Sequence, residues 1–446
     1  KHINLKKASK KIADALWEQD TGGVSQEEIQ ENLATLENAS FAHLHNHTQF
    51  SILQSTISVP DLVSAAAKAK MPAVAMTDHA NMMGAFHFVN GVLNHNKGVE
   101  SRNEANQKRY EATQNGTLEE GQEPLDELPE PEQEITPIIG CEFQVCEDHT
   151  NKSQKDNGYQ IVMLAKSKKG YLNLAKMSSI AFVDGKYYVP RIDKKIVEQY
   201  KEDVMVLTGN LYGEVPSKVL NVGENQAEEA LLWWKETFGD DLYIEIMRHG
   251  QEDEDRVNQV LIQFAKKHNV KLVATNNTYY AEKENAHAHD ILLCVKDGEK
   301  QSTPIGRGRG YRYGLPNQEY YFKSSDEMKE LFKDIPEAII NIQEIIDKVE
   351  TFTLARDVLL PAFDIPEEFQ FEEDKLDGGK RGENKFLRHI TYEGAKKRYG
   401  EITPEIDERL DFELKVIEKT GYPGYFLIVE DFIRAARQMD VSVGPG

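Results

Sequence analysis

The chain has 446 residues, of which 39% are hydrophobic and 29% charged, and its formal net charge at pH 7 is −22. This length allows two or three domains, and no run approaches the roughly 18 apolar residues that cross a bilayer, which excludes a membrane-spanning helix. The acidic balance excludes a surface that coats nucleic acid uniformly, although it leaves room for a local basic groove. Cys141, Cys146 and Cys294 are too scattered for a disulfide framework, so we expect free thiols and a cytoplasmic location.

Residues 1–40 are charged and predict an N-terminal helical segment, and the lack of an initiator Met indicates a piece of a longer protein. From Phe41 onward, short apolar runs alternate with amphipathic stretches, which predicts strands separated by helices. The predicted strands are 41–45, 73–77, 137–143, 159–165, 204–208, 242–247 and 271–275, with helices at 60–70, 82–94, 170–181, 224–237 and 253–268. This alternation is typical of a parallel sheet, and seven repeats without a long crossover favour a (β/α) barrel over an open sheet.

One segment interrupts the alternation. Residues 119–134 are rich in Asp and Glu, contain no Lys or Arg, and include three prolines. Such a composition buries too little apolar surface to offset the entropy lost on ordering. We therefore predict a disordered insertion over 97–134, either a tolerated surface loop or an acidic docking tail.

Beyond the last predicted strand the sequence becomes helical. Helices are expected at 284–295, 326–333 and 336–349, and then, after a polar stretch at 364–384, at 384–399, 404–420 and 424–439. The helical spacing of five apolar residues predicts that they share a core-facing side: Phe426, Val429, Phe432, Ile433 and Ala436. The domain boundaries follow as 1–40, 41–350 with barrel strands over 41–281, and 351–446.

The ends of the first three predicted strands are rich in metal-ligand residue types. His45 and His47 end the first strand, His79 follows the second, and Glu142 ends the third. Alternate residues of a strand point to the same side, and the carboxyl ends of barrel strands converge on one mouth. A lone His-x-His is more often an ordinary hydrogen-bonded pair, but three such strand ends predict a site for zinc, manganese or iron.

Several motifs, taken in order, resemble the bacterial DNA polymerase III alpha subunit family. They are FAHLHNHTQFSIL, AMTDHANMMGAFHF, PIIGCEF, MLAKSKKGYLNL, VATNNTYY and, last, GYPGYFLIVEDFI followed by VSVGPG. The resemblance extends from about Phe41 to Gly446, and the final pair of motifs is the most specific. It implies a distorted seven-stranded PHP-type (β/α) barrel, followed by a mostly helical segment that leads into the polymerase palm.

The family's active PHP sites hold up to three metal ions, and only part of that ligand pattern is present. His45, His47, His79 and Glu142 match it. Amides or a phenol replace the remaining ligands at Gln54, Gln160, Asn210, Asn277 and Tyr279. These groups bind divalent cations poorly but hydrogen-bond well, so we expect a structural barrel with at most one Zn²⁺ or Mn²⁺ ion. The alternative is an active metal-dependent phosphoesterase or 3′–5′ exonuclease.

The polymerase part implied by the resemblance is incomplete. Gly444 and Gly446 would begin a glycine-rich loop whose backbone N–H groups bind the nucleotide triphosphate. The aspartates that hold Mg²⁺ for nucleotidyl transfer come later in the family, beyond Gly446. We therefore expect no catalytic residue of DNA synthesis within this chain, and no polymerase activity from it alone.

The resemblance also implies partners: primer–template DNA and a deoxynucleoside triphosphate, with a sliding clamp, a clamp-loader subunit and a proofreading exonuclease. Arg307, Arg309 and Arg312, interleaved with Gly and Tyr, predict a flexible basic patch that contacts single-stranded DNA. The alternative is a solvated charged face. Two other interpretations of the whole chain remain: a stand-alone phosphatase of histidinol-phosphate type, and a scaffold without activity.

Overall fold

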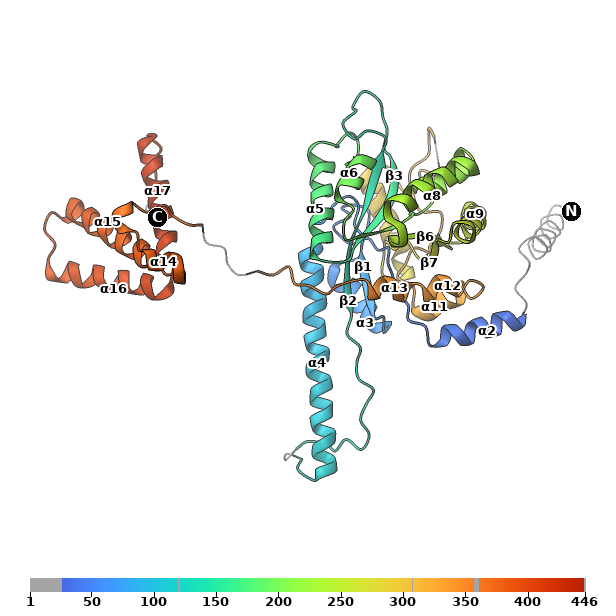
Figure 1. Ribbon diagram of the computed structural model, residues 1–446, viewed down its shortest axis with the longest axis horizontal. Helices are drawn as coiled ribbons and strands as arrows, with labels where there is room; N and C mark the ends of the chain where they lie inside the picture. The colour runs from blue at the N-terminus through green and yellow to red at the C-terminus, as the bar shows by residue number, and fades with distance from the viewer. Residues whose placement is uncertain (1–25, 119–120, 307, 357–360, 445–446) are drawn as a thin grey trace. The chain divides into compact units, whose positions relative to one another are not determined.

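Seven strands form one curled sheet in the computed structural model, which describes residues 26–118, 121–306, 308–356 and 361–444 (Figure 1). They are β1 (Ala73–Met76), β2 (Thr136–Cys146), β3 (Tyr159–Ala165), β4 (Ile192–Asp193), β5 (Val204–Leu207), β6 (Leu242–Met247) and β7 (Lys271–Thr275). The strand order is β1-β2-β3-β5-β6-β7, and β4 pairs with β2. The predicted seven-stranded α/β fold is confirmed, with β4 as a strand that the sequence did not predict.

The sheet is mixed, so the prediction of a purely parallel sheet is wrong. β3 runs antiparallel to both β2 and β5, whereas the other pairs are parallel. The cause is the connection at 147–158, which contains no helix. A parallel neighbour is usually reached through a helical crossover, whereas this loop has no helix and returns the chain from β2 as an antiparallel partner.

The predicted first strand, 41–45, is not a regular strand; only Asn46 makes an isolated bridge, to Thr278. The Asn46 side chain disrupts the ladder because its Nδ2 donates to the carbonyls of His43 and Ala75. The segment nevertheless connects both edges of the sheet. Ala75 N donates to His43 O at 2.9 Å on the β1 side, and His47 N donates to Thr278 O at 2.9 Å just after β7.

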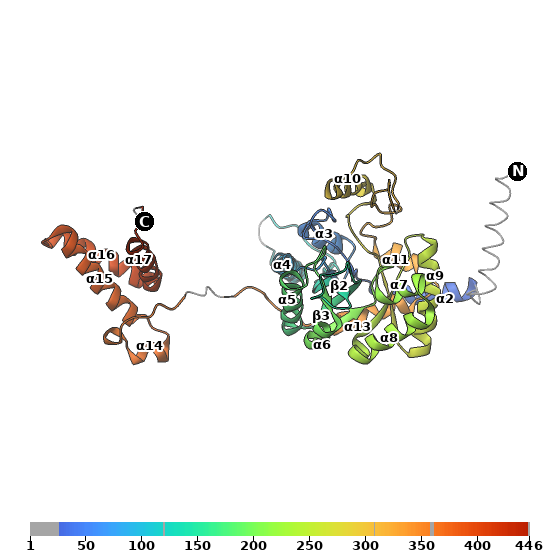
Figure 2. The same ribbon diagram turned by 90° about the horizontal axis from the view of Figure 1, so that it is seen from above.

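Helices cover the outside of the sheet (Figures 1 and 2). Three of them begin at a residue whose side chain accepts hydrogen bonds from the first turn: Ser58, Ser167 and Asp193. The strands between them are almost entirely buried. The three cysteines are buried free thiols, which confirms the prediction of free thiols. These helices are α3 (Val59–Lys68), α5 (Lys168–Val183), α6 (Lys194–Tyr200), α7 (Glu214–Asn221), α8 (Glu224–Phe238) and α9 (Glu252–His268), and α2 (Gln26–Glu37) precedes them.

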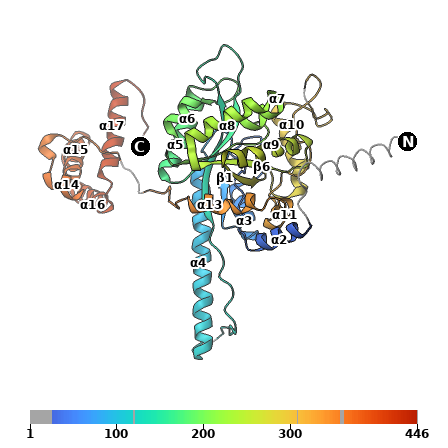
Figure 3. The ribbon, with the colours of Figure 1, turned by 45° about the vertical axis from the view of Figure 1, so that its right-hand side comes forward.

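Helix α4 (Ala85–Asn115) corrects the prediction of a disordered insertion over 97–134. Residues 99–115 contain no Pro or Gly and many good helix formers, so the helix continues until Gly116 ends it with φ 67°. Its second half extends beyond the sheet (Figures 1 and 3). The acidic segment returns along it: Arg102 Nε and Nη2 donate to Glu132 at 2.8 and 2.6 Å.

Four further helices, α10 (Ala286–Asp297), α11 (Ser325–Leu331), α12 (Glu337–Ile340) and α13 (Ile342–Asp347), follow the barrel strands. Glu344 of α13 ties this region to the sheet, because it accepts from Tyr243 Oη at 2.8 Å and pairs with Lys271 and Lys348. Burial raises the pKa of Glu344, but hydrogen bonds from Lys271, Tyr243 and Lys348 outweigh burial and lower the pKa to about 2.

Glu344→Gln is therefore expected to reduce stability in a pH-dependent way. The folded-state pKa of about 2 lies below the ordinary value of 4.5, so the stabilisation is complete above pH 4.5 and is lost as pH falls through 2. Because the side chain is 30% exposed, we expect a loss on the order of 1–2 kcal/mol at pH 7. Urea unfolding at pH 7 and pH 3 tests this, with exposed Glu337→Gln as control; a pH-independent deficit would contradict it.

A second compact unit, residues 356–446, is separate from the first, residues 1–355. It contains η3 (Glu367–Phe369), α14 (Glu372–Asp377), α15 (Arg381–Tyr399), α16 (Pro404–Thr420) and α17 (Pro423–Gln438). Leu387, Leu414 and Leu427 form its small core. The prediction that Phe426 and Phe432 face a core is wrong, since they are 43% and 67% exposed, while Leu427 is buried in their place.

Candidate metal centre

The four predicted ligand residues meet inside the barrel. His45 and His47 lie in the irregular segment that precedes β1 in the sequence and packs in space between β1 and β7. Both residues are fully buried. His79 follows β1 and makes a backbone bridge to Glu142 in β2. The His79 side chain is 14% exposed and Glu142 is 1% exposed, so His79 is the member that reaches solvent.

Glu142 is the centre of this group. Its Oε2 lies 3.0 Å from His45 Nε2 and 3.8 Å from His47 Nε2, and its Oε1 lies 2.6 Å from His79 Nδ1. Potential ligand atoms of His45, His47 and Glu142 all lie within 4.8 Å of one another. The rings of His47 and His79 stack with centroids 4.1 Å apart. One carboxylate thus faces three imidazoles.

Amides at the replaced ligand positions bond to one another and to a histidine. Asn210 Nδ2 donates to Gln160 Oε1 at 2.9 Å, which joins the ends of β5 and β3. Asn277 Oδ1 lies 3.0 Å from His47 Nε2. These contacts are the amide–amide and amide–histidine hydrogen bonds expected from the sequence, and Asn277 competes with any cation for the Nε2 atom of His47.

The other two replaced positions behave differently from each other. Tyr279 stacks on His47 with ring centroids 4.5 Å apart, and its hydroxyl lies 3.5 Å from His79 Nε2. The Gln54 side chain instead accepts from Lys296 of α10 at 3.3 Å, and its backbone carbonyl accepts from His289 at 2.7 Å. Tyr279 therefore packs within the histidine group, whereas Gln54 connects to α10, which stands at one end of the barrel (Figure 2).

Glu245 belongs to this group as well, although the sequence reasoning missed it. It lies within β6, is 1% exposed, and its Oε1 accepts from His45 Nδ1 at 2.8 Å. The available signal was one carboxylate in the otherwise apolar run LYIEIM. Because buried carboxylates are costly unless paired, an isolated Glu inside a predicted core strand indicates a partner.

The electrostatics of the group follow from its burial. Burial lowers the pKa of His45, but Glu245 and Glu142 outweigh burial and raise that pKa to about 10. Burial and the neighbouring His79 hold the pKa of His47 well below its usual value. Burial raises the pKa of Glu142, but His79 and His45 outweigh it and hold this pKa low. Without a metal, the raised pKa therefore favours a protonated His45 between Glu245 and Glu142.

The ligand atoms of His45, His47 and Glu142 lie close enough together to share one divalent cation, and His79 bonds Glu142 beside them. Imidazole nitrogens with one carboxylate suit Zn²⁺ or Mn²⁺, and the cation would replace the proton of His45 that faces Glu142. The donors for additional ions are missing, because Gln160 and Asn210 bond to each other and Gln54 bonds to Lys296. Carboxylates, which bring several cations together, are absent from those positions.

A second group of His and Asp side chains, Asp148, His149 and Asp193, lies beyond β2. Asp193 caps α6 through Ile196 N and accepts from His149 Nδ1 at 2.6 Å, and Asp148 accepts from Thr150. These hydrogen bonds hold the loop at 147–158. They explain why the three side chains lie close together without a metal ion.

Of the predicted DNA-binding arginines, the structure describes Arg309 and Arg312. Arg312 is 4% exposed at its side chain and donates from Nη1 and Nη2 to Asp290 at 2.6 and 2.8 Å. The charge of Arg312 is thus paired with Asp290 of α10, so it is not a free cation as the sequence suggested. Arg309 is exposed, and Arg307 lies outside the described residues.

The predicted nucleotide-binding glycines lie at the end of the second unit. Gly444 is exposed and borders an open groove of about 750 Å³ along α17, together with Arg398, Arg434 and Arg437. Gly446 lies outside the described residues. Glu430 also lines the groove and pairs with Arg434.

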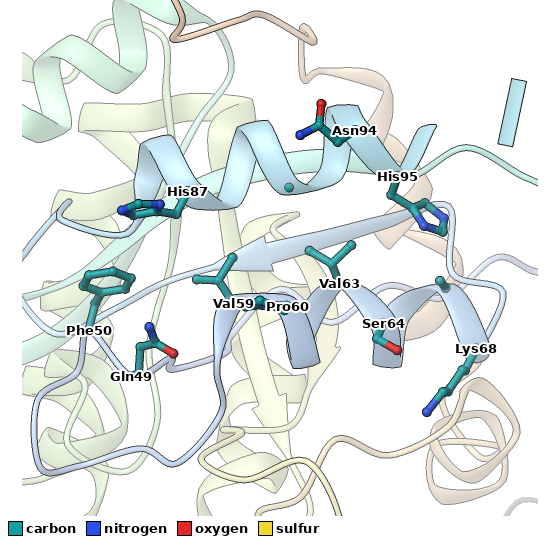
Figure 4. A pocket seen from close by; sticks show the side chains of 12 residues that line it. Gln49, Phe50, Val59, Pro60, Val63, Ser64, Lys68, His87, Asn94 and His95 are labelled. Atoms are coloured by element: carbon teal, nitrogen blue, oxygen red, sulfur yellow. The ribbon is translucent and has the colours of Figure 1, made fainter. Parts of the chain in front are cut away.

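An open groove of about 750 Å³ also lies between α3 and α4 (Figure 4). Val59 and Val63 of α3 face His87 and His95 of α4 across it. None of the four ligand residues lines this groove, so it is distinct from the metal centre.

In the described part of the chain, no helix has the length and apolar character needed to span a membrane.

Comparison with protein families identifies two matching regions. Residues 43–249 match the family described as the PHP domain, and residues 385–446 match the one described as the bacterial DNA polymerase III alpha NTPase domain. The first region contains His45, His47, His79 and Glu142, and the second begins within α15.

Curated relatives cover nearly the whole chain. DNA polymerase III subunit alpha of Borreliella burgdorferi is 35% identical over 91% of the chain and 31% of its own length. The proteins of that name from Treponema pallidum and Aquifex aeolicus are 34% and 33% identical, over 91% of the chain and 30% and 32% of their own lengths. The chain thus spans about a third of these relatives. A solved putative metal-dependent phosphoesterase from Bifidobacterium adolescentis is 13% identical over 65% of the chain, with a TM-score of 0.28, too low to support any inference.

Proposed function

We propose that this chain, a member of the bacterial DNA polymerase III alpha family, forms the N-terminal portion of a replicative polymerase and supports template-directed DNA synthesis. In the chain, the barrel is followed by the helical unit that leads into the palm. Primer–template DNA, deoxynucleoside triphosphate and Mg²⁺ would be bound by the longer protein, which acts in the cytoplasm. A sliding clamp, a clamp-loader subunit and a proofreading exonuclease are the partners that the family implies.

Within this protein the barrel serves a structural role, and its metal centre holds at most one ion. The observation that carries this proposal is the bonding of the replaced ligands: Gln160 to Asn210, and Asn277 to His47. A multi-ion phosphoesterase needs those positions to supply anionic or imidazole donors. Here they satisfy each other, which stabilises the barrel without requiring several cations.

His45, His47, His79 and Glu142 would hold the single ion. A bound Zn²⁺ or Mn²⁺ would act as a Lewis acid toward an oxygen ligand. The protein's own groups keep that position dry and ordered: His45 and His47 are fully buried, and the Tyr279 ring covers His47. Only the His79 side chain is partly exposed, which leaves little room for a phosphoester chain to approach the centre.

Metal analysis and a nuclease assay test the proposal together. Protein purified without chelator is expected to contain at most one zinc or manganese ion per chain, as measured by inductively coupled plasma mass spectrometry. It is expected to show no release of nucleotides from a 3′-labelled single strand in Mn²⁺, and no hydrolysis of small phosphomonoesters. Two or more tightly bound ions together with turnover would overturn the structural role and support a phosphoesterase or exonuclease instead.

The polymerase proposal has its own test. The 446-residue chain should not extend a primer, whereas a protein lengthened past Gly446 through the palm should do so in the presence of Mg²⁺. Failure of the lengthened, folded protein to extend a primer would refute the polymerase assignment without affecting the conclusion about metal content.

A further inference from the structure

Glu245 is a carboxylate buried in the centre of the barrel. Its strand neighbours Ile244 and Ile246 are buried apolar residues, and Glu245 itself is 1% exposed. Burial of a carboxylate costs several kcal/mol unless hydrogen bonds and charges compensate it. An apolar residue would fill this position more cheaply, so the contacts of Glu245 indicate what the carboxylate does.

Two side chains hold one oxygen of this carboxylate. Glu245 Oε1 accepts from His45 Nδ1 at 2.8 Å and from Thr275 Oγ1 of β7 at 2.5 Å. The Glu245 backbone N–H donates to Thr208 Oγ1 at 3.0 Å, which fixes the strand beside β5. The other oxygen, Oε2, has no hydrogen-bond partner among the described residues. The hydrogen bonds of Glu245 therefore leave half of the carboxylate unsatisfied, so they do not by themselves explain why a carboxylate is buried at this position.

The contact with His45 determines which ring nitrogen faces the other donors. A carboxylate oxygen only accepts, so His45 Nδ1 carries the hydrogen of this bond. Nε2 then points to the opposite side, 3.0 Å from Glu142 Oε2, which is itself 3.8 Å from His47 Nε2. Glu245 thus aims Nε2 of His45 at the group of candidate ligands while remaining outside that group.

We infer that Glu245 is a positioning residue of the metal centre: it holds His45 through Nδ1, so that Nε2 is directed at the ion. This inference rests on the single-ion site proposed above. A carboxylate behind a ligating imidazole fixes the ring's orientation and makes it a better donor, and loss of such a partner typically weakens metal binding about 10–100-fold.

The test compares Glu245→Gln with a matched control, Glu254→Gln. Glu254 is also a buried glutamate that accepts from a buried histidine, with its Oε1 2.6 Å from His249 Nδ1, but that histidine is not in the ligand group. Wild type and both variants are stripped with EDTA, and their Zn²⁺ dissociation constants are measured by competition with a chromophoric chelator. Circular dichroism and thermal unfolding in EDTA establish that each variant folds.

Glu245→Gln is expected to bind Zn²⁺ about 10–100-fold more weakly than wild type, and Glu254→Gln to bind it equally well. If Glu245→Gln does not fold without metal, Thr275→Val, which removes the hydroxyl that holds Glu245, should weaken Zn²⁺ binding by a smaller factor. Unchanged affinity in the folded variant, or an equal loss in Glu254→Gln, would overturn the inference. A wild-type protein that takes up no Zn²⁺ would overturn the single-ion site as well, and that result is read from wild type alone.

Discussion

Glu142→Gln is expected to lower the free energy of unfolding of the metal-free protein by about 3–5 kcal/mol. Glu142 is the carboxylate that faces His45, His47 and His79 inside the barrel. A glutamine keeps the shape but removes the negative charge, which leaves the protonated His45 with Glu245 as its only close carboxylate. Removal of one partner from a buried charged group is among the most damaging substitutions, because the remaining charge stays desolvated.

Urea unfolding followed by circular dichroism, with EDTA present throughout, measures this loss. Glu147→Gln, at an exposed position just after β2, is the matched control and should change stability by no more than about 0.5 kcal/mol. Equal stability of Glu142→Gln and wild type would mean that the histidine group does not depend on this carboxylate without metal.

Arg191→Met is expected to destabilise the first unit by at least about 3 kcal/mol. Arg191 is fully buried, and its guanidinium donates to the backbone carbonyls of Gly185, Asp156, His149 and Asn151 at 2.8–3.2 Å. Methionine keeps the unbranched stem of the side chain but lacks the guanidinium, so all four carbonyls lose this donor. Unsatisfied buried acceptors each cost on the order of 1–3 kcal/mol.

Amide hydrogen exchange shows which segment Arg191→Met destabilises and by how much. The amides of residues 147–158, the loop that the guanidinium holds against β4, should exchange faster than in wild type, while those of β6 and β7 change little. Exposed Lys195→Met on α6 serves as the control for loss of a positive charge. Unchanged exchange in the 147–158 loop would show that other contacts hold it.

The sequence predicted those features that depend on local composition. Apolar runs such as 159–165 and 242–247 became β3 and β6 with the same bounds, because burial on both faces selects continuous apolar strands. The grouping of His45, His47, His79 and Glu142 was predictable for a related reason. Strand ends of a barrel converge, so side chains distant in sequence meet wherever the strand count is right.

Features that depend on long-range partners were not predictable in the same way. Arg312 looked like a free cation among glycines, but Asp290, 22 positions earlier, pairs with it. The acidic segment after residue 115 favoured a prediction of disorder that included 97–115, although the composition of those residues favours the helix that forms. The antiparallel direction of β3 depends on the geometry of one loop, which hydrophobic periodicity does not record.

Apolar periodicity and motif spacing are local properties of the chain, and they were enough to predict the fold class, the resemblance to the family and the four candidate ligands. The contacts that complete the site depend on the tertiary structure. It bonded Asn277 to His47 and Gln160 to Asn210, and it placed Glu245 behind His45. The physical reason is that a hydrogen bond between residues as far apart as 45 and 245 depends on the register of separate strands, and that register is set by packing of the whole barrel.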